Sequence, residues 1–138
     1  MRFMVIVKAS TESEGGKMPT ETELRDMGKF NNELSKAGVM LAAEGLLPSS
    51  KGARIQFNGT KRTVVDGPFA SARELVAGFW LVQVKSREEA VELFKRCPFV
   101  EGELELRQLA EDADFGDMVN KVPEVFEAER KVRESARH

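Results

Sequence analysis

The sequence predicts an α+β fold of the ferredoxin-like type, in which a split βαβ arrangement builds an antiparallel sheet with two helices on one face. The first observation is the order of segments, which runs β-α-β-hairpin-β-α-β along the chain. The second is that the main strands 2–8 and 76–84 are apolar on both faces, as in strands that are covered on both sides. Two helices cover one face only. The opposite face therefore needs another cover.

A second copy of the chain is the simplest cover for that face. Two sheets that pack face to face would bury the remaining apolar side chains in a symmetric homodimer. The sequence therefore predicts a homodimer, because this two-sided apolar pattern leaves one face of the sheet uncovered in a single copy.

The first half of the chain contains a strand, a loop and a helix. After the strand at 2–8, residues 9–18 are polar and include Gly15-Gly16, which predicts a mobile loop and a partial lid. Thr20 and Glu23 form a capping box that starts a helix, and Gly38 ends it in the left-handed conformation.

The middle of the chain contains two strands and a hairpin. Residues 39–47 read as a strand and 48–52 as a turn. The segments 54–57 and 60–65 form a hairpin around Asn58-Gly59, since Asn-Gly is a strong signal for a tight turn. The hairpin leads to Asp66 and then to the strand at 76–84.

The second helix and the last strand complete the predicted α+β fold. Ser86 and Glu89 form another capping box, and Pro98 ends the helix that runs over 90–97. Residues 103–109 alternate charged and apolar side chains, the pattern of a half-buried strand at the edge of a sheet.

The chain is expected to divide into an α+β domain at 1–110 and a helical extension at 111–138. Residues 110–117 are acidic, and Pro123 stands at the first position of a helix that is expected to run through Arg137.

Composition excludes several classes of function. The 21 basic and 23 acidic residues give a net charge of −2 without long blocks of either sign, so we expect no nucleic-acid partner. No apolar run approaches the roughly 18 residues of a membrane span, and we expect a cytoplasmic protein with no membrane partner. With one cysteine, Cys97, and one histidine, His138, we expect no metal site and no cofactor.

The motif Asp66-Gly67-Pro68-Phe69 is the most informative feature for function. An acidic side chain at a strand end, followed by two residues that restrict the backbone, holds a carboxylate where sheets open into clefts. The alternative is an aspartate that caps its own turn.

The residues around this motif resemble a known family. Asp66-Gly67-Pro68-Phe69-Ala70, Gly78-Phe79-Trp80, Gly38-Val39 and Glu44-Gly45-Leu46 together look like the DGPF branch of the YciI-like, or YCII-related, proteins. The resemblance covers roughly the first 110 residues. It implies a dimeric α+β barrel with a site built on an aspartate and a histidine.

Under this resemblance, Asp66 is the catalytic candidate. The family's histidine has no counterpart here, because the only histidine, His138, lies outside the matched region. The aspartate–histidine mechanism therefore does not carry over, and a lone carboxylate that acts as a general base or anchors a substrate remains.

Four further residues are candidates for binding a ligand. Glu44 either faces solvent or is held in a cleft, and Arg107 either pairs with Glu44 or Asp66 or binds an anionic ligand. Phe69 of the motif and Trp80 of the most apolar strand complete the predicted small-molecule pocket. The first interpretation of Trp80 is a core or interface residue.

Three hypotheses for function follow. The first is a homodimer with a small-molecule pocket around Asp66 and an activity of lyase or hydrolase type. The second is a non-catalytic accessory protein, since the resemblance also implies a link to sigma factors. The third is a YciI-like scaffold without the catalytic histidine.

Overall fold

The computed structural model describes residues 1–136, apart from the side chain of Arg73. The chain divides into two compact units, Met1–Gln108 and Leu109–His138. Each unit has its own elements and is described by itself. Within the described residues, no helix is both long and apolar enough to cross a membrane.

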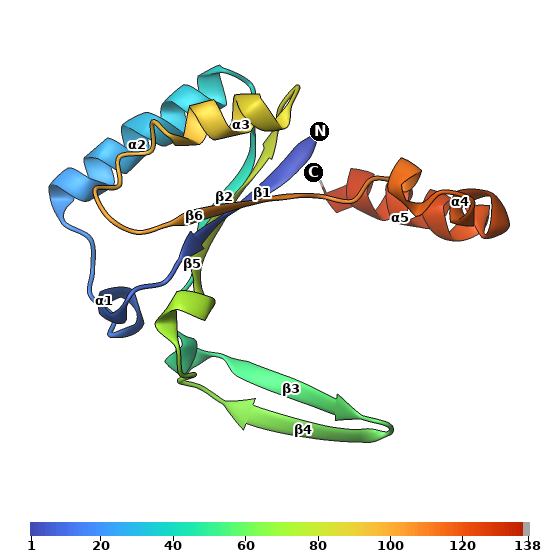
Figure 1. Ribbon diagram of the computed structural model, residues 1–138, viewed down its shortest axis with the longest axis horizontal. Coiled ribbons are helices and arrows are strands. Elements are labelled where there is room, and N and C mark those ends of the chain that lie inside the picture. Colours follow the sequence, from blue (N-terminus) through green and yellow to red (C-terminus); the bar gives the residue numbers. More distant parts are fainter. Residues whose placement is uncertain (137–138) are drawn as a thin grey trace. The chain divides into compact units, whose positions relative to one another are not determined.

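The first unit has the predicted ferredoxin-like fold (Figure 1). Its four-stranded sheet is antiparallel and has the order β2-β5-β1-β6, so that the two strands that are apolar on both faces are central and the last strand is at an edge. Figure 1 shows two helices on one face of this sheet. The elements are β1 (Arg2–Lys8), α2 (Glu21–Lys36), β2 (Met40–Gly45), β5 (Val76–Gln83), α3 (Arg87–Phe94) and β6 (Leu104–Gln108).

The core lies between the sheet and these two helices. Trp80 is its centre: the Trp80 ring packs against Phe30 at 6.0 Å and Phe94 at 5.2 Å between ring centroids. The indole Nε1 donates a hydrogen bond of 2.8 Å to Oδ1 of Asn31 in α2, which satisfies the polar end of a buried ring. The other buried members of this cluster are Phe3, Val5, Leu34, Val39, Val82, Val84 and Ala90.

Both predicted helix starts are confirmed. The hydroxyl of Thr20 accepts a hydrogen bond of 3.1 Å from the Glu23 N–H, and Ser86 accepts one of 3.1 Å from the Glu89 N–H. Gly38 follows α2 with φ 73°, as predicted for a left-handed cap. The second helix ends at Phe94, earlier than predicted, because the amides of Arg96 and Cys97 bond three residues back, to Leu93 and Phe94, in a tightened turn.

Residues 9–18 contain a helix that the loop prediction missed. α1 (Thr11–Glu14) begins at Ser10, whose hydroxyl accepts from the Ser13 N–H, while the Ser13 hydroxyl accepts from the Ser10 N–H. This reciprocal pair uses serine where the usual capping box has Glu or Gln. The sequence signal was therefore weak.

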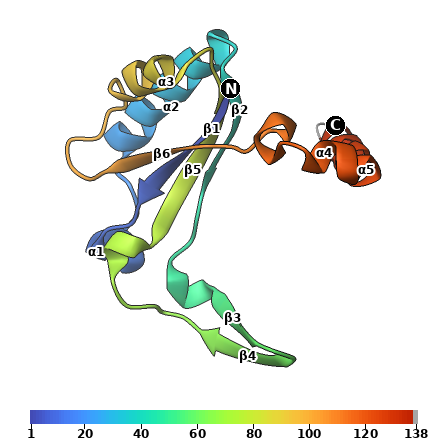
Figure 2. The ribbon, with the colours of Figure 1, turned by 45° about the vertical axis from the view of Figure 1, so that its right-hand side comes forward.

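The predicted hairpin is present as a separate two-stranded sheet, made of β3 (Ala53–Asn58) and β4 (Lys61–Asp66). Asn58 pairs with Lys61, so the turn centres on Gly59-Thr60 and not on Asn58-Gly59. Gly59, with φ 61°, takes the first central position, where a type II′ turn places glycine. Figures 1 and 2 show the hairpin leaving one end of the main sheet on the side away from α2 and α3.

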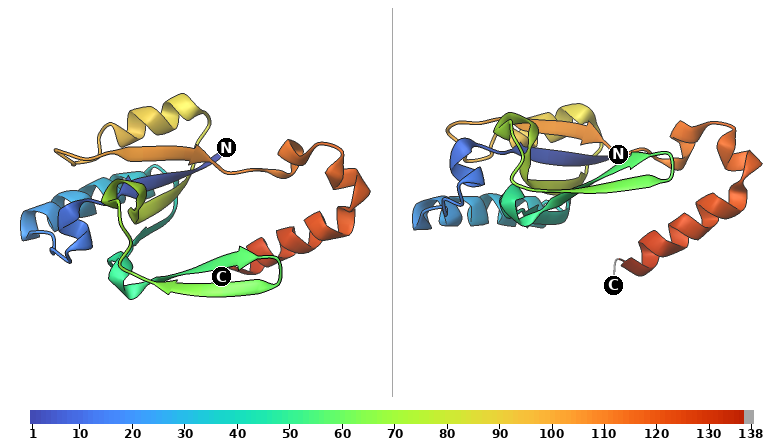
Figure 3. Two further views of the ribbon diagram at one scale, coloured as in Figure 1. Left: turned by 60° about the horizontal axis from the view of Figure 1, so that its bottom comes forward. Right: turned by 90° about the horizontal axis from the view of Figure 1, so that it is seen from below.

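The second unit is helical (Figure 3). The rings of Phe115 and Phe126 pack at 5.4 Å between centroids. The Asp112 carboxylate forms ion pairs with Arg130 at 3.5 Å and with Arg133 at 3.6 Å. Pro123 begins the longest helix, where the sequence placed it. The elements are η3 (Asp112–Phe115), α4 (Met118–Lys121) and α5 (Pro123–Ala136).

Candidate functional site

The face of the main sheet away from α2 and α3 is apolar at its centre. Side chains alternate along a strand, and Phe3, Val5, Trp80 and Val82 point into the helix-covered core. Their neighbours therefore point to the other side. We call this side the open sheet face; its central side chains are half-buried and comprise Met4, Ile6, Phe79 and Leu81.

Charged side chains border the open sheet face at both edges. Glu44 of β2 is directly opposite Phe79 at one edge and is exposed. At the other edge Glu105 of β6 lies between two cations: its Oε1 is 3.3 Å from Lys8 Nζ and its Oε2 is 3.3 Å from Arg107 Nη1. One edge therefore carries a carboxylate, and the other carries two cations and one carboxylate.

The hydrogen bond from Lys8 and, after it, the hydrogen bond from Arg107 lower the pKa of Glu105. The sequence allowed Arg107 to pair with Glu44 or Asp66, whereas the structure pairs it with Glu105 two residues earlier on the same strand. The pair is solvent-exposed, with 71% of the Arg107 side chain accessible. Its guanidinium is therefore accessible to a further anion.

Glu44 and Arg107 do not meet within one copy. The sheet order places β5 and β1 between their strands, and three strand spacings amount to about 14 Å. They lie on the same face but at opposite edges. The predicted site that joins them is therefore not assembled inside a single chain.

The Asp-Gly-Pro-Phe motif fastens the hairpin to the end of the main sheet. A Cβ atom on Gly67 would lie 1.8 Å from the carbonyl oxygen of Ser49, so no side chain fits at this position. The Phe69 N–H donates a hydrogen bond of 3.0 Å to the Ser49 hydroxyl, and the Gly67 N–H donates one of 3.1 Å to the Gly52 carbonyl. Gly67 is required here for a close backbone contact.

Ser49 also holds α1. Its backbone N–H donates to Oε1 of Glu14 at 3.1 Å, and its hydroxyl donates to Oε2 of the same carboxylate. Residues 9–18, predicted to be a mobile lid, are therefore tied through Glu14 to the turn after β2. Ser49 joins three segments that are far apart in the sequence.

The other predicted site residues are separated. Asp66 is exposed at the end of β4, opposite Ala53. Phe69 is half-buried, with the Arg54 guanidinium 3.9 Å from its ring centroid. Trp80 is only 4% exposed and lies on the helix side of the sheet. We therefore assign Trp80 to the core and not to a ligand site.

The structure shows a shallow hollow of about 180 Å³ at the end of α3, lined by Cys97, Phe99, Val100 and Leu104 among others. Burial raises the pKa of the Cys97 thiol, which makes it a weak nucleophile. No group of three or more metal-ligating side chains occurs within residues 1–136. His138 lies outside the described residues.

Comparison with known proteins identifies the family. Residues 1–111 match the model of the YCII-related domain, so the chain belongs to the YCII-related domain family. It is 29% identical over 83 residues to an uncharacterised protein of Rhizobium meliloti (strain 1021), covering 60% of this chain and 67% of that protein.

A solved structure is also similar in part. The 5-chloro-2-hydroxyhydroquinone dehydrochlorinase of Burkholderia phenoliruptrix, determined with 2,5-dihydroxybenzoquinone, matches with a TM-score of 0.45 and 10% identity. The match covers 82% of this chain and 97% of that chain.

The substitution Gly67→Ala should destabilise the first unit, because the added methyl group meets the Ser49 carbonyl. We expect a loss of about 1–3 kcal/mol in the free energy of unfolding, as for other overpacked sites, measured by urea denaturation. Gly28→Ala is the control, since an added Cβ there meets nothing within 4 Å, and alanine favours the helix. Equal stability of the two variants would contradict the close contact.

The substitution Glu105→Gln should change how stability depends on pH. The folded pKa of Glu105 is lowered, so its contribution is present above the unfolded pKa and is lost as pH falls through the folded pKa. Wild type should therefore be more stable than the variant at neutral pH and lose this advantage below about pH 4. Urea midpoints over a pH series measure it, with Glu101→Gln as the control, and a pH-independent difference would contradict it.

Proposed function

We propose that this member of the YCII-related domain family is a homodimer that binds a small molecule between the open sheet faces of its two copies. The observation that supports the proposal is the open sheet face itself. It is an apolar centre with charged edges on a sheet whose opposite face is already covered by two helices. Uncovered apolar faces of this kind mark interaction sites.

The charges at the two edges favour a second copy as the cover. When two sheets stack about a two-fold axis that runs along the strands, the β2 edge of one copy lies over the β6 edge of the other. Glu44 of one copy then lies level with Glu105 of its partner, which is flanked by Lys8 and Arg107. The single carboxylate and the more cationic edge are complementary in charge.

The same arrangement defines the ligand site. The residues Glu44 and Arg107, which are separated within one copy, would approach each other across the dimer. An exposed guanidinium binds a carboxylate or phosphate with two hydrogen bonds, and Phe79 and Leu81 offer apolar contact beside it. The chemistry favours a small molecule with an apolar body and an anionic group.

Ligand binding is the primary function that we propose for this site. Asp66 belongs to the hairpin and not to the sheet that carries Glu44 and Arg107. Glu44 would be the proton acceptor in a reaction of lyase or hydrolase type. The only histidine of the chain is its last residue, His138.

Leu81→Asp should convert the homodimer into a monomer, because it places a charge at the centre of the buried face. Light scattering at micromolar concentration should give a mass near 31 kDa for wild type, twice the 15.4 kDa of one chain, and near 15 kDa for the variant. Leu24→Asp, at an exposed leucine of α2 on the other side of the sheet, is the control. A monomeric wild type would overturn the homodimer.

Arg107→Gln should weaken the binding of an anionic ligand without dissociating the dimer, whereas Glu44→Gln should not weaken it, because that change removes a negative charge beside the anion site. The probes are small aromatic and aliphatic carboxylates, with the corresponding neutral amides as controls, measured by calorimetry. We expect the carboxylates to bind and the Arg107 variant to lose about tenfold in affinity, as for a charge-assisted pair. Lys29→Gln, on α2, is the control variant. Equal binding of acids and amides would contradict an anion site.

A further inference from the structure

The hairpin carries one apolar face that nothing in the first unit covers. Ile55 pairs with Val64, Phe57 with Arg62, and Ala53 with Asp66, and directly opposite residues project to the same side. We call these six side chains the hairpin face. Ile55, Phe57 and Val64 are 58%, 70% and 64% exposed. A lone two-stranded hairpin is marginally stable in water. We therefore expect the hairpin face to pack against a partner.

The two sides of the hairpin differ in character. The side away from the hairpin face carries Arg54, Gln56, Asn58, Lys61 and Thr63, together with one apolar residue, Val65. It is polar enough to face water. The apolar partner must therefore meet the hairpin face and not the opposite side.

The side chains of the hairpin face are complementary in size to those of a second hairpin face that runs in the opposite direction. From root to tip, β3 presents Ala53, Ile55 and Phe57. A second hairpin that runs in the opposite direction places its large Phe57 over the small Ala53 of the first, with the two Ile55 residues at the centre. Sizes therefore match at each level, as in well-packed sheet faces.

The charges match in the same arrangement. On β4, Asp66 lies at the root and Arg62 at the tip, with Val64 between them. Reversal places Arg62 of one hairpin over Asp66 of the other, and the Val64 residues meet at the centre. We propose that the hairpin face of one copy packs antiparallel on the hairpin face of a second copy, closed by two Arg62–Asp66 ion pairs.

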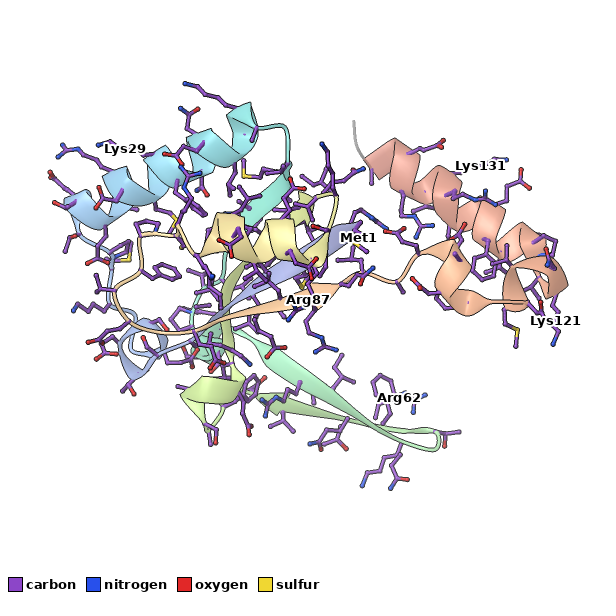
Figure 4. All side chains as sticks on the ribbon, turned by 45° about the horizontal axis from the view of Figure 1, so that its top comes forward. Met1, Lys29, Arg62, Arg87, Lys121 and Lys131 are labelled. Atoms are coloured by element: carbon purple, nitrogen blue, oxygen red, sulfur yellow. The ribbon has the colours of Figure 1, made fainter. Side chains whose placement is uncertain are left out.

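Arg62 is already held in a position to make this pair. Its Nη1 donates to the carbonyl oxygens of Gly59 at 2.7 Å and Lys61 at 3.0 Å, and its Cζ lies 4.6 Å from the Phe57 ring centroid. Figure 4 shows this side chain near the hairpin tip. The remaining N–H groups on Nε and Nη2 are available to a carboxylate.

Asp66 provides the matching acceptor. Its carboxylate is exposed, and within the described part of the chain no hydrogen bond or ion pair engages it. The root is also the most constrained part of the hairpin, since the Gly67 and Phe69 contacts to the turn at Ser49 follow directly. The position of Asp66 is therefore restricted by the contacts of the residues that follow it.

The contact is small compared with the roughly 800 Å² per partner of a stable interface. It therefore rests on the homodimer proposed above, which holds the two hairpins at high effective concentration. Its role is to clasp the dimer and fix the orientation of the two copies. The function assigned to Asp66 is then a contact between subunits.

A cysteine at the centre of the hairpin face tests the packing. In the full chain with Cys97→Ser, the variant Ile55→Cys places one thiol per copy next to the axis. A short bis-maleimide should link it into a covalent dimer at micromolar concentration. Gln56→Cys, on the opposite side of β3, is the matched control and should remain largely monomeric on a denaturing gel. Absence of the Ile55→Cys link would overturn the clasp.

Charge reversal tests the ion pairs in the same cross-linking assay. Arg62→Asp or Asp66→Arg alone should lower the yield about tenfold, since each places like charges together. The double variant should restore the yield, because the pair is re-formed with opposite polarity. Failure of this rescue would overturn the Arg62–Asp66 pairing. A folded dimer with normal ligand binding but no cross-link would overturn the clasp alone, whereas a monomer would overturn the homodimer as well.

Discussion

The alternation of side chains along the two central strands governs the whole first unit. A strand has two faces, and β1 and β5 carry apolar residues on both. One set, with Trp80 at its centre, is buried under α2 and α3 and stabilises the fold of a single chain. The other set has no helix over it in the unit, and the chemistry at its edges determines what can bind there. Stability and association therefore depend on neighbouring residues of the same strands.

The contact between Gly67 and Ser49 links the hairpin to that sheet. Ser49 accepts from the Phe69 amide and donates to Glu14, so one hydroxyl connects the motif, the turn after β2 and α1. The motif that suggested a catalytic carboxylate is thus explained first by backbone packing. Its glycine is needed because a methyl group has no room.

The sequence was sufficient for features that are set by local chemistry or simple periodicity. Thr20, Ser86 and Gly38 each have one dominant backbone interaction, and the structure confirms all three. Features set by distant contacts were not predictable. Phe79 and Trp80 are adjacent and both apolar, and the pattern cannot say which of them faces the helices. Ser49 belongs to no motif, because its role depends on Glu14 and Phe69, which lie 35 and 20 residues away.

The one-sided attachment of the hairpin has a mechanical consequence. β3 and β4 pair with each other over six residue pairs and join the main sheet only through their base. Such an arm behaves as a cantilever of roughly 20 Å, in which a rotation of a few degrees at the base moves the tip by an ångström or more. The stiffness of the turn at Ser49 thereby sets the volume that the far end explores.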